Sequence, residues 1–278
     1  MLSEPKALAL LLVHSNVHIS LSATSIALVT MVLLDLRIDP IPLFIVFAAT
    51  MFVYSLNRFT DLEEDERNVP DRAAFTKRYG RLLLTLGVGL YLVAIGVAVV
   101  LDLPGAGYMV IPLLVAIAYS HFRLKKVFLV KNLTVGLAWG LIPLGVGVYY
   151  EVLEEPELLF LAGYVTAMLT VAAIIFDIKD IEGDREEGIR TVPVVFNPER
   201  TRLISQGLNI AIASSVLVAA LAALIPSTFL VLLAFNAYVG GYIPFATRDR
   251  GPLFYGFVVD GEQIVLVCCV LVLDILVW

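Results

Sequence analysis

The sequence predicts an all-α membrane protein, a polytopic bundle of about nine transmembrane helices that forms one domain over residues 1–278. Hydrophobic residues make up 60% of the chain and charged residues only 16%, whereas a soluble domain carries roughly 25% charged residues. Many apolar runs approach the roughly 20 residues that a helix needs to cross a bilayer. The mean hydropathy of +0.92 agrees with these runs, so no separate soluble module is expected.

Breaks that contain proline or glycine separate the apolar runs. The connections at residues 101–106 and 225–227 are so short that the helices on either side are expected to pack as antiparallel hairpins. The first run is long enough to include a turn at the membrane interface. The nine expected spans cover residues 7–34, 41–58, 80–101, 106–121, 130–150, 158–177, 202–224, 227–246 and 259–277.

The basic residues predict how the bundle is oriented. With nine spans, 18 of the 19 lysines and arginines lie on the side of the N-terminus, and only Arg37 lies on the other side. Loops rich in Lys and Arg stay on the cytoplasmic side of a membrane. The sequence therefore predicts an integral protein of the cytoplasmic membrane whose N-terminus faces the cytoplasm.

Two acidic segments follow the second and the sixth expected span, so both lie on the predicted cytoplasmic face. Their polar residues are spaced so that each set shares one face if its segment is helical. The matching positions indicate two pseudo-repeated halves that meet at a site. The first set is Asn57, Asp61 and Asp65, and the second set is Asp177, Asp180 and Asp184.

This many oxygen-bearing side chains exceed what one Mg²⁺ takes, since Mg²⁺ usually binds one or two carboxylates and completes its shell with water and phosphate. Two or more Mg²⁺ ions that bridge a diphosphate fit the count better. Basic residues that surround the loop after the fourth span could contact the phosphate oxygens. They are Arg123, Lys125, Lys126 and Lys131.

The predicted ligand is therefore an organic diphosphate whose apolar tail lies in the membrane. The expected reaction is ionisation at carbon, in which Mg²⁺ and the basic residues stabilise the departing diphosphate and an allylic cation remains. Such a cation needs aromatic faces and a dry pocket. Tyr119 is favoured because Arg123 follows it at i+4. Anchoring at the membrane interface explains the nearby aromatic residues equally well; they are Tyr54, Phe59, Tyr119, Phe122 and Phe176.

The motifs resemble those of the UbiA-type superfamily of intramembrane prenyltransferases. That family carries Asn-x3-Asp-x3-Asp after the second span, which here reads Asn57, Asp61 and Asp65. It carries Asp-x3-Asp after the sixth span, which here reads Asp180 and Asp184. Its Tyr-x3-Lys element after the fourth span here runs from Tyr119 to Arg123, so that arginine replaces lysine. The resemblance covers nearly the whole chain through the order of the motifs and the number of spans.

The resemblance implies helices around a central cavity in which Mg²⁺ holds a polyprenyl diphosphate between the acidic segments, and an acceptor attacks the prenyl cation. The acceptor would be a quinone-ring precursor or an isoprenoid or glycerol-phosphate lipid. Besides these substrates and membrane lipids, no nucleic acid or obligatory protein partner is expected. The main metal ligands would be Asn57, Asp61, Asp180 and Asp184. Asp65 and Asp177 would bind metal or support the ligands, and Tyr119 and Arg123 would bind diphosphate or stabilise the cation.

The first span departs from the family, because many members carry an Arg-Pro element there and this chain carries His14, Asn16 and His18. Polar residues inside a membrane are candidates for function. They could line the acceptor pocket, with one histidine as the base that takes the acceptor's proton. The alternative is hydrogen bonding between helices of the bundle. Glycines of the fifth span, Gly136, Gly140, Gly145 and Gly147, indicate close helix packing.

Two rival functions fit the sequence less well. A divalent-cation transporter would need carboxylates near the middle of the membrane, on a path that reaches both faces, whereas the acidic segments lie at one interface. A CDP-alcohol phosphotransferase would carry an Asp-x-x-Asp-Gly-x-x-Ala-Arg motif, which the sequence lacks. A membrane prenyltransferase is the predicted enzyme.

Overall fold

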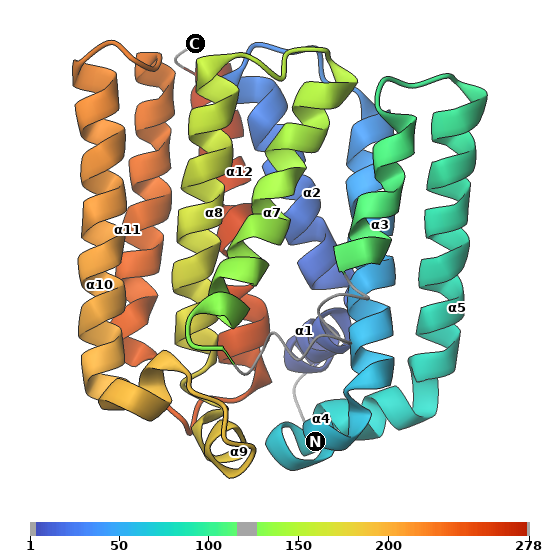
Figure 1. Cartoon of the computed structure of the whole chain (residues 1–278), viewed down its shortest axis with the longest axis vertical. Coiled ribbons are helices and arrows are strands. Elements are labelled where there is room, and N and C mark those ends of the chain that lie inside the picture. Colours follow the sequence, from blue (N-terminus) through green and yellow to red (C-terminus); the bar gives the residue numbers. More distant parts are fainter. Residues whose placement is uncertain (1–3, 116–126, 277–278) are drawn as a thin grey trace.

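The computed structural model describes residues 4–115 and 127–276, and every regular element in these two ranges is a helix. The long helices stand side by side in one bundle (Figure 1). Short helices α1 (Glu4–His14), α4 (Leu62–Asn68) and α9 (Ile181–Glu186) lie toward one end of it. The other helices are α2 (Val17–Leu33), α3 (Pro40–Thr60), α5 (Pro70–Val100), α7 (Val130–Tyr149), α8 (Pro156–Phe176), α10 (Val192–Leu221), α11 (Leu232–Tyr242) and α12 (Glu262–Leu276).

Seven helical segments of the described residues are long and apolar enough to cross a membrane, or eight if the bent pair α1 and α2 forms one span. The prediction of an all-helical membrane bundle is confirmed, and the expected count of nine is approximate. The fourth expected span is described only in part, as an apolar helix over Ala106–Val115, and the rest of it lies outside the described residues.

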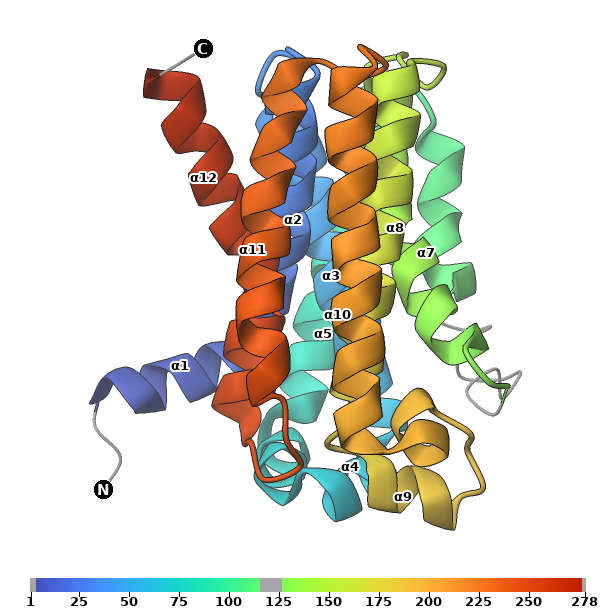
Figure 2. The same cartoon turned by 90° about the vertical axis from the view of Figure 1, so that its left-hand side faces the viewer.

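The first expected span, residues 7–34, is not one straight helix. Helices α1 and α2 meet at an angle of 71°, and α1 extends sideways from the bundle (Figure 2). Asn16 at the bend adopts a left-handed conformation with φ 64°, which Asn tolerates better than most residues. Its side-chain amide donates a hydrogen bond to Ser55 Oγ of α3 at 3.3 Å. The bend is thereby attached to the neighbouring helix.

Helix α2 forms the centre of the bundle. Twelve of its 17 residues are buried, and it packs against α3, α7 and α12. Hydroxyl groups on this buried helix find carbonyl partners: Thr30 Oγ1 donates to Ile26 of the same helix at 2.8 Å, and Ser22 Oγ donates to the carbonyl of Asp260 near the start of α12. Helix α5 shows the opposite pattern, because large apolar side chains such as Leu82 and Leu92 are exposed. Exposed apolar side chains along a spanning helix are suited to contact with lipid.

Helices α7 and α8 pack so closely that glycine is required where they touch. A Cβ atom at Gly136 would lie 2.4 Å from the backbone oxygen of Thr166, and one at Gly140 would lie 2.0 Å from Thr166 Oγ1. At Gly147 it would lie 2.1 Å from Leu158. Gly145 has no neighbouring atom within 4 Å of that position. The expectation of close packing is therefore wrong for Gly145.

The short helices bring the two acidic segments together. Helix α4 follows α3, α9 follows α8, and both lie at the same end of the bundle (Figures 1 and 2). The two short helices are in contact with each other. This contact positions the site.

Candidate active site

The spacing of both acidic segments is preserved by backbone hydrogen bonds. The amide of Asp61 donates to the carbonyl of Asn57 at 2.9 Å, and the amide of Asp65 donates to the carbonyl of Asp61 at 3.0 Å. In the second segment, the amide of Asp180 donates to the carbonyl of Asp177 at 3.2 Å, and the amide of Asp184 donates to the carbonyl of Asp180 at 2.9 Å. Each set of predicted ligands thus follows one continuous helical or turn segment.

Asp65 of the first segment is held by an arginine of the next helix. Arg72 of α5 donates from Nε to Oδ2 at 2.9 Å and from Nη2 to Oδ1 at 2.5 Å. Arg58 Nη1 lies 4.0 Å from the same Oδ2. Asp65 is 5% exposed, so this bidentate ion pair satisfies a buried charge.

Asp177 of the second segment is held by the start of α7. Lys131 Nζ lies 2.9 Å from Asp177 Oδ1, and Asn132 Nδ2 donates to Asp177 Oδ2 at 2.8 Å. The same lysine lies 3.7 Å from Asp184 Oδ1. Lys131 therefore bridges two of the predicted metal ligands.

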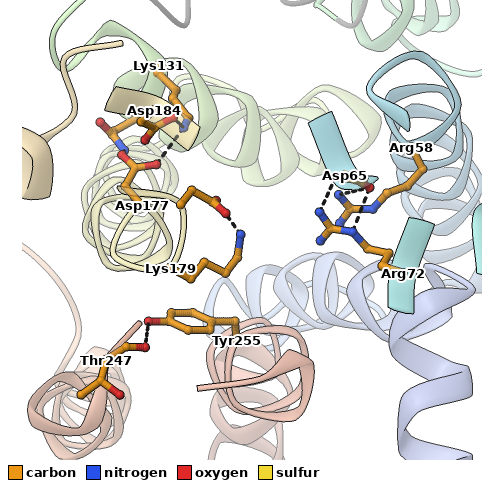
Figure 3. A network of polar contacts seen from close by, with 11 residues as sticks. Arg58, Asp65, Arg72, Lys131, Asp177, Lys179, Asp184, Thr247 and Tyr255 are labelled. Atoms are coloured by element: carbon orange, nitrogen blue, oxygen red, sulfur yellow. Dashed lines mark hydrogen bonds and ion pairs between the residues drawn. The ribbon is translucent and has the colours of Figure 1, made fainter. Parts of the chain in front are cut away.

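A third ion pair joins Lys179 and Asp180. Lys179 Nζ is 2.5 Å from Asp180 Oδ2, and Figure 3 shows Lys179 between the Asp177 group and the Asp65 group. The ammonium lies 5.6 Å from the centre of the Phe176 ring. That ring packs at 5.5 Å against Tyr255, whose hydroxyl donates to the carbonyl of Thr247 at 2.8 Å. An aromatic wall thus borders the charged groups.

The carboxylates and cations set each other's protonation. Burial raises the pKa of Asp184 to about 6, with Lys131 opposing the rise and Asp177 adding to it. Burial also acts to raise the pKa of Asp180, but the adjacent Lys179 outweighs it and holds that pKa below its usual value. Burial lowers the pKa of Lys179. Asp180 is therefore ionised at neutral pH and paired with its lysine.

The residue types at the site suit Mg²⁺, but the side chains are not arranged around a metal position. Carboxylate and amide oxygens are the ligands that this ion prefers. Asn57 Oδ1 and Asp180 Oδ1 are buried and accept no hydrogen bond from any described residue, so two predicted ligand oxygens have acceptor capacity left. Over residues 4–115 and 127–276, however, no three Asp, Glu, His or Cys side chains form a metal-binding cluster. Four of the predicted ligands instead face cations, namely Asp65, Asp177, Asp180 and Asp184.

Five of the predicted basic and aromatic candidates lie outside the described residues, and their roles stay predictions. They are Tyr119, Phe122, Arg123, Lys125 and Lys126. Lys131 is the member of the basic group that the structure describes, and it contacts the second acidic segment.

The polar residues near the first bend make contacts that also suit helix packing. His18 stacks on Phe257 with ring centres 4.6 Å apart, and its Nε2 lies 3.2 Å from the Phe257 carbonyl oxygen. Asn16 bonds to α3, as described above. The ring of His14 lies 5.6 Å from that of Phe75, and its buried Nε2 has no hydrogen-bond partner in the described part of the chain. Among His14, Asn16 and His18, His14 is thus the residue with a buried polar atom that makes no hydrogen bond to a described residue.

Several site residues were not assigned from the sequence. Arg58, Arg72 and Lys179 entered the sequence argument only as charges that orient the bundle, and Asn132 did not enter it. Two of them could have been found from the sequence, because Arg58 adjoins the predicted ligand Asn57 and Lys179 adjoins the predicted ligand Asp180. Arg72 could not, because its contact with Asp65 depends on the turn between α4 and α5.

An apolar cavity of 420 Å³ lies along the bundle. Its walls come from α2, α3, α5, α7 and the residues around η1 (Ala106–Val110). Tyr54 lines it and precedes Arg58 by one helical turn, so the end of the cavity at Tyr54 is the one toward the charged groups. Tyr149 and Leu153 line it near the opposite end of the bundle. A long apolar chain could lie in this cavity with its polar end at the site.

Comparison with known proteins gives consistent matches. The model of the UbiA prenyltransferase family matches residues 7–252. A digeranylgeranylglyceryl phosphate synthase of Methanosphaera stadtmanae is 28% identical over 167 residues, which are 59% of this chain and 60% of that protein. One from Methanothermobacter thermautotrophicus is 32% identical over 152 residues, 54% of this chain and 53% of that protein. The chain thus spans little more than half the length of these relatives.

A solved structure shares the fold. The apo structure of a UbiA homolog from Aeropyrum pernix K1 matches with a TM-score of 0.67 at 17% identity, covering 92% of this chain and 98% of that one. At this identity the match concerns the arrangement of the helices.

Proposed function

This chain belongs to the UbiA prenyltransferase family, and we propose that it moves a polyprenyl group from a polyprenyl diphosphate to a lipophilic acceptor. The observation that carries the proposal is the arrangement of paired charges at one end of an apolar cavity. Acids of both segments are paired with Arg72, Lys131 and Lys179, and Tyr54 connects this end of the bundle with the cavity.

The pairs support binding of a metal-bound diphosphate by exchange of partners. A diphosphate brings negative charge that the arginine and lysine side chains can bind, and divalent cations bring positive charge that the freed carboxylates can bind. Each side chain then trades one partner for another of the same sign. Two buried charges are not separated without compensation, which would cost several kcal/mol.

We assign the metal ligands as Asn57, Asp61, Asp180 and Asp184, supported by Asp65 and Asp177. The chemistry supplied by two or more bound Mg²⁺ ions is neutralisation of charge on the departing diphosphate. Arg58, Arg72, Lys131 and Lys179 hold and orient its oxygens. Further diphosphate contacts are assigned to Arg123, Lys125 and Lys126.

The cavity and its aromatic border serve the other half of the substrate. The apolar walls hold the prenyl tail and exclude water, which protects a carbocation from hydrolysis. Tyr54 and Phe176 lie near the charged end, where a developing cation would gain from the negative faces of their rings. Tyr119 is proposed to act in the same way.

The acceptor is proposed to be a glycerol-phosphate ether lipid. The support is that both relatives named above are digeranylgeranylglyceryl phosphate synthases. A quinone-ring precursor would leave the diphosphate site unchanged and is distinguished by the mass of the product.

His14 remains the candidate base, because its buried Nε2 has no partner among the described residues. The charge distribution of the loops supports a cytoplasmic site and N-terminus.

The test uses membranes that contain the full chain, radiolabelled geranylgeranyl diphosphate and either geranylgeranylglyceryl phosphate or a host lipid extract. A labelled lipid that forms with Mg²⁺ and not without it is expected. Asp61→Ala should abolish it, whereas Glu63→Ala, which removes an exposed carboxylate of the same segment, should not. Release of diphosphate without a prenylated lipid would contradict transfer. Absence of turnover, together with divalent-cation flux across the membrane, would favour a transporter.

A further inference from the structure

A second polar cavity lies near the same end of the bundle but outside the charged pairs. Its volume is 240 Å³, and α9, the first turns of α10 and the loop after η4 (Ile243–Phe245) line it. Each of these three elements contributes an arginine, namely Arg185, Arg200 and Arg248. None of the residues that line the cavity carries a carboxylate. The cavity is therefore a positively charged hollow.

A break in α10 sets the position of Arg200. Asn197 interrupts the helix with φ 69° and ψ 165°, and its Oδ1 accepts a hydrogen bond from the amide of Arg200 at 3.0 Å. Thr201 Oγ1 donates to the carbonyl of Asn197 at 2.7 Å. Because the Asn197 side chain already caps the Arg200 amide, the charge of the cavity comes from the guanidinium groups.

The arginines of this cavity are only weakly neutralised. Arg248 pairs with Glu182, and the two side chains are 45% and 71% exposed, so the pair contributes little and can be exchanged. Within residues 4–115 and 127–276, Arg185 and Arg200 form no ion pair with a carboxylate. An anionic group that entered the cavity would find two guanidinium groups without a competing acid.

The surroundings of the cavity place it at the membrane surface. Val195 and Phe196 line it and are 40% and 38% exposed, and they lie at the start of the membrane-spanning segment Val192–Leu221. Phe245, which precedes the Arg248 loop, is 57% exposed. Apolar side chains beside arginines at the end of a span match the boundary between acyl chains and headgroups.

We propose that this cavity binds the phosphate headgroup of an anionic membrane lipid. Clusters of Lys and Arg beside a span attract anionic lipids, and arginine binds phosphate through two parallel hydrogen bonds. The lipid is distinct from the reacting substrates. Asp184 of α9 is 3% exposed and lies near Lys131, whereas the next residue, Arg185, is exposed and lines this cavity, so α9 presents different residues to the two sites.

The experiment measures lipid retention and does not depend on turnover. The full chain is reconstituted in nanodiscs of phosphatidylcholine with a minor fraction of phosphatidylglycerol, and retained lipids are counted by native mass spectrometry. The variants are Arg200→Gln and Arg185→Gln, alone and combined. Arg190→Gln is the matched control, because Arg190 is exposed on the same connection and does not line the cavity. Thermal unfolding of each variant shows whether it is folded.

The wild-type chain should retain phosphatidylglycerol in preference to phosphatidylcholine. Each arginine removed should weaken retention about fivefold, since a basic residue near an anionic membrane surface contributes about 1 kcal/mol, and Arg190→Gln should leave it unchanged. Equal retention by folded wild-type and doubly substituted chains would overturn the proposal. Displacement of the lipid by inorganic phosphate at comparable concentration would also overturn it, because the cavity would then recognise a free anion.

Discussion

Arg72 and Asp65 face each other across the turn between α4 and α5, and the guanidinium contacts both carboxylate oxygens, at 2.9 and 2.5 Å. In the proposed function this pair separates when substrate binds, so that Arg72 contacts phosphate and Asp65 supports the metal. The arginine thus has two measurable roles. It stabilises the fold without substrate and binds the diphosphate with it.

Arg72→Gln should lower both stability and donor affinity. It leaves the buried Asp65 carboxylate with Arg58 alone at 4.0 Å, and removing one partner of a buried pair costs about 3 kcal/mol. Thermal unfolding and the KM for geranylgeranyl diphosphate measure the two effects. Adding Asp65→Asn to Arg72→Gln should restore stability without restoring affinity. Lys77→Gln is the control, because its pair with Glu66 is exposed, and a large loss of stability there would contradict this account.

Asn132→Ala should destabilise the protein by about 1–3 kcal/mol. The substitution removes the donor at 2.8 Å from Asp177 Oδ2 and leaves a buried acceptor without its partner. Leu133→Ala is a suitable comparison, because that side chain is 47% exposed on the same helix. Equal unfolding temperatures for the wild-type chain and Asn132→Ala would show that the hydrogen bond contributes nothing.

Gly136→Ala should destabilise the packing of α7 against α8 by about 1–3 kcal/mol. The new Cβ would lie 2.4 Å from the backbone oxygen of Thr166, and backbone cannot move aside as a side chain can. Gly163→Ala is the control on α8, because it has no neighbouring atom within 4 Å. Its unfolding temperature should stay the same or rise slightly, since alanine favours helix over glycine. Equal losses in both variants would contradict the packing argument.

Gly145→Leu should shift donor preference toward shorter prenyl chains. Gly145 lines the apolar cavity and lies about 21 Å along α7 from Lys131 at the site, so a larger side chain would shorten the cavity. The measurement compares kcat/KM for farnesyl and geranylgeranyl diphosphate. Gly89→Leu, at an exposed glycine that does not line the cavity, should leave the ratio unchanged. The same ratio in Gly145→Leu and the wild-type chain would show that the tail lies elsewhere.

The fold class could be predicted because the apolar runs and the placement of the basic residues are properties of the chain itself. Details that depend on contacts between helices could not. The bend at Asn16 has no proline or glycine to mark it, and a bond to Ser55 of another helix holds it. The break at Asn197, where φ is 69° and ψ is 165°, falls by contrast within the expected connection between residues 177 and 202, and the proline that follows it marks it in the sequence.

For the candidate site, too, the local features could be predicted and the contacts between helices could not. The spacing of acidic residues in each segment is local, and backbone hydrogen bonds preserve it in the structure. The pairing of these acids with cations is not local, since Asp177 meets Lys131 from another helix. Gly145 shows the same limit, because sequence alone does not distinguish a glycine that packs from one that leaves space for a cavity.

The most direct test of the central claim is equilibrium binding of radiolabelled geranylgeranyl diphosphate to the purified chain, with and without Mg²⁺, in the wild type and in Asp180→Asn. The account predicts that Mg²⁺ strengthens binding of the diphosphate and that Asp180→Asn removes most of this dependence, because Asp180 would then no longer hold the metal. Glu182→Gln, an exposed substitution in the same segment, should bind as the wild type does. Binding that is equally tight without Mg²⁺ and unaffected by Asp180→Asn would contradict the claim that the acidic segments hold a metal-bound diphosphate.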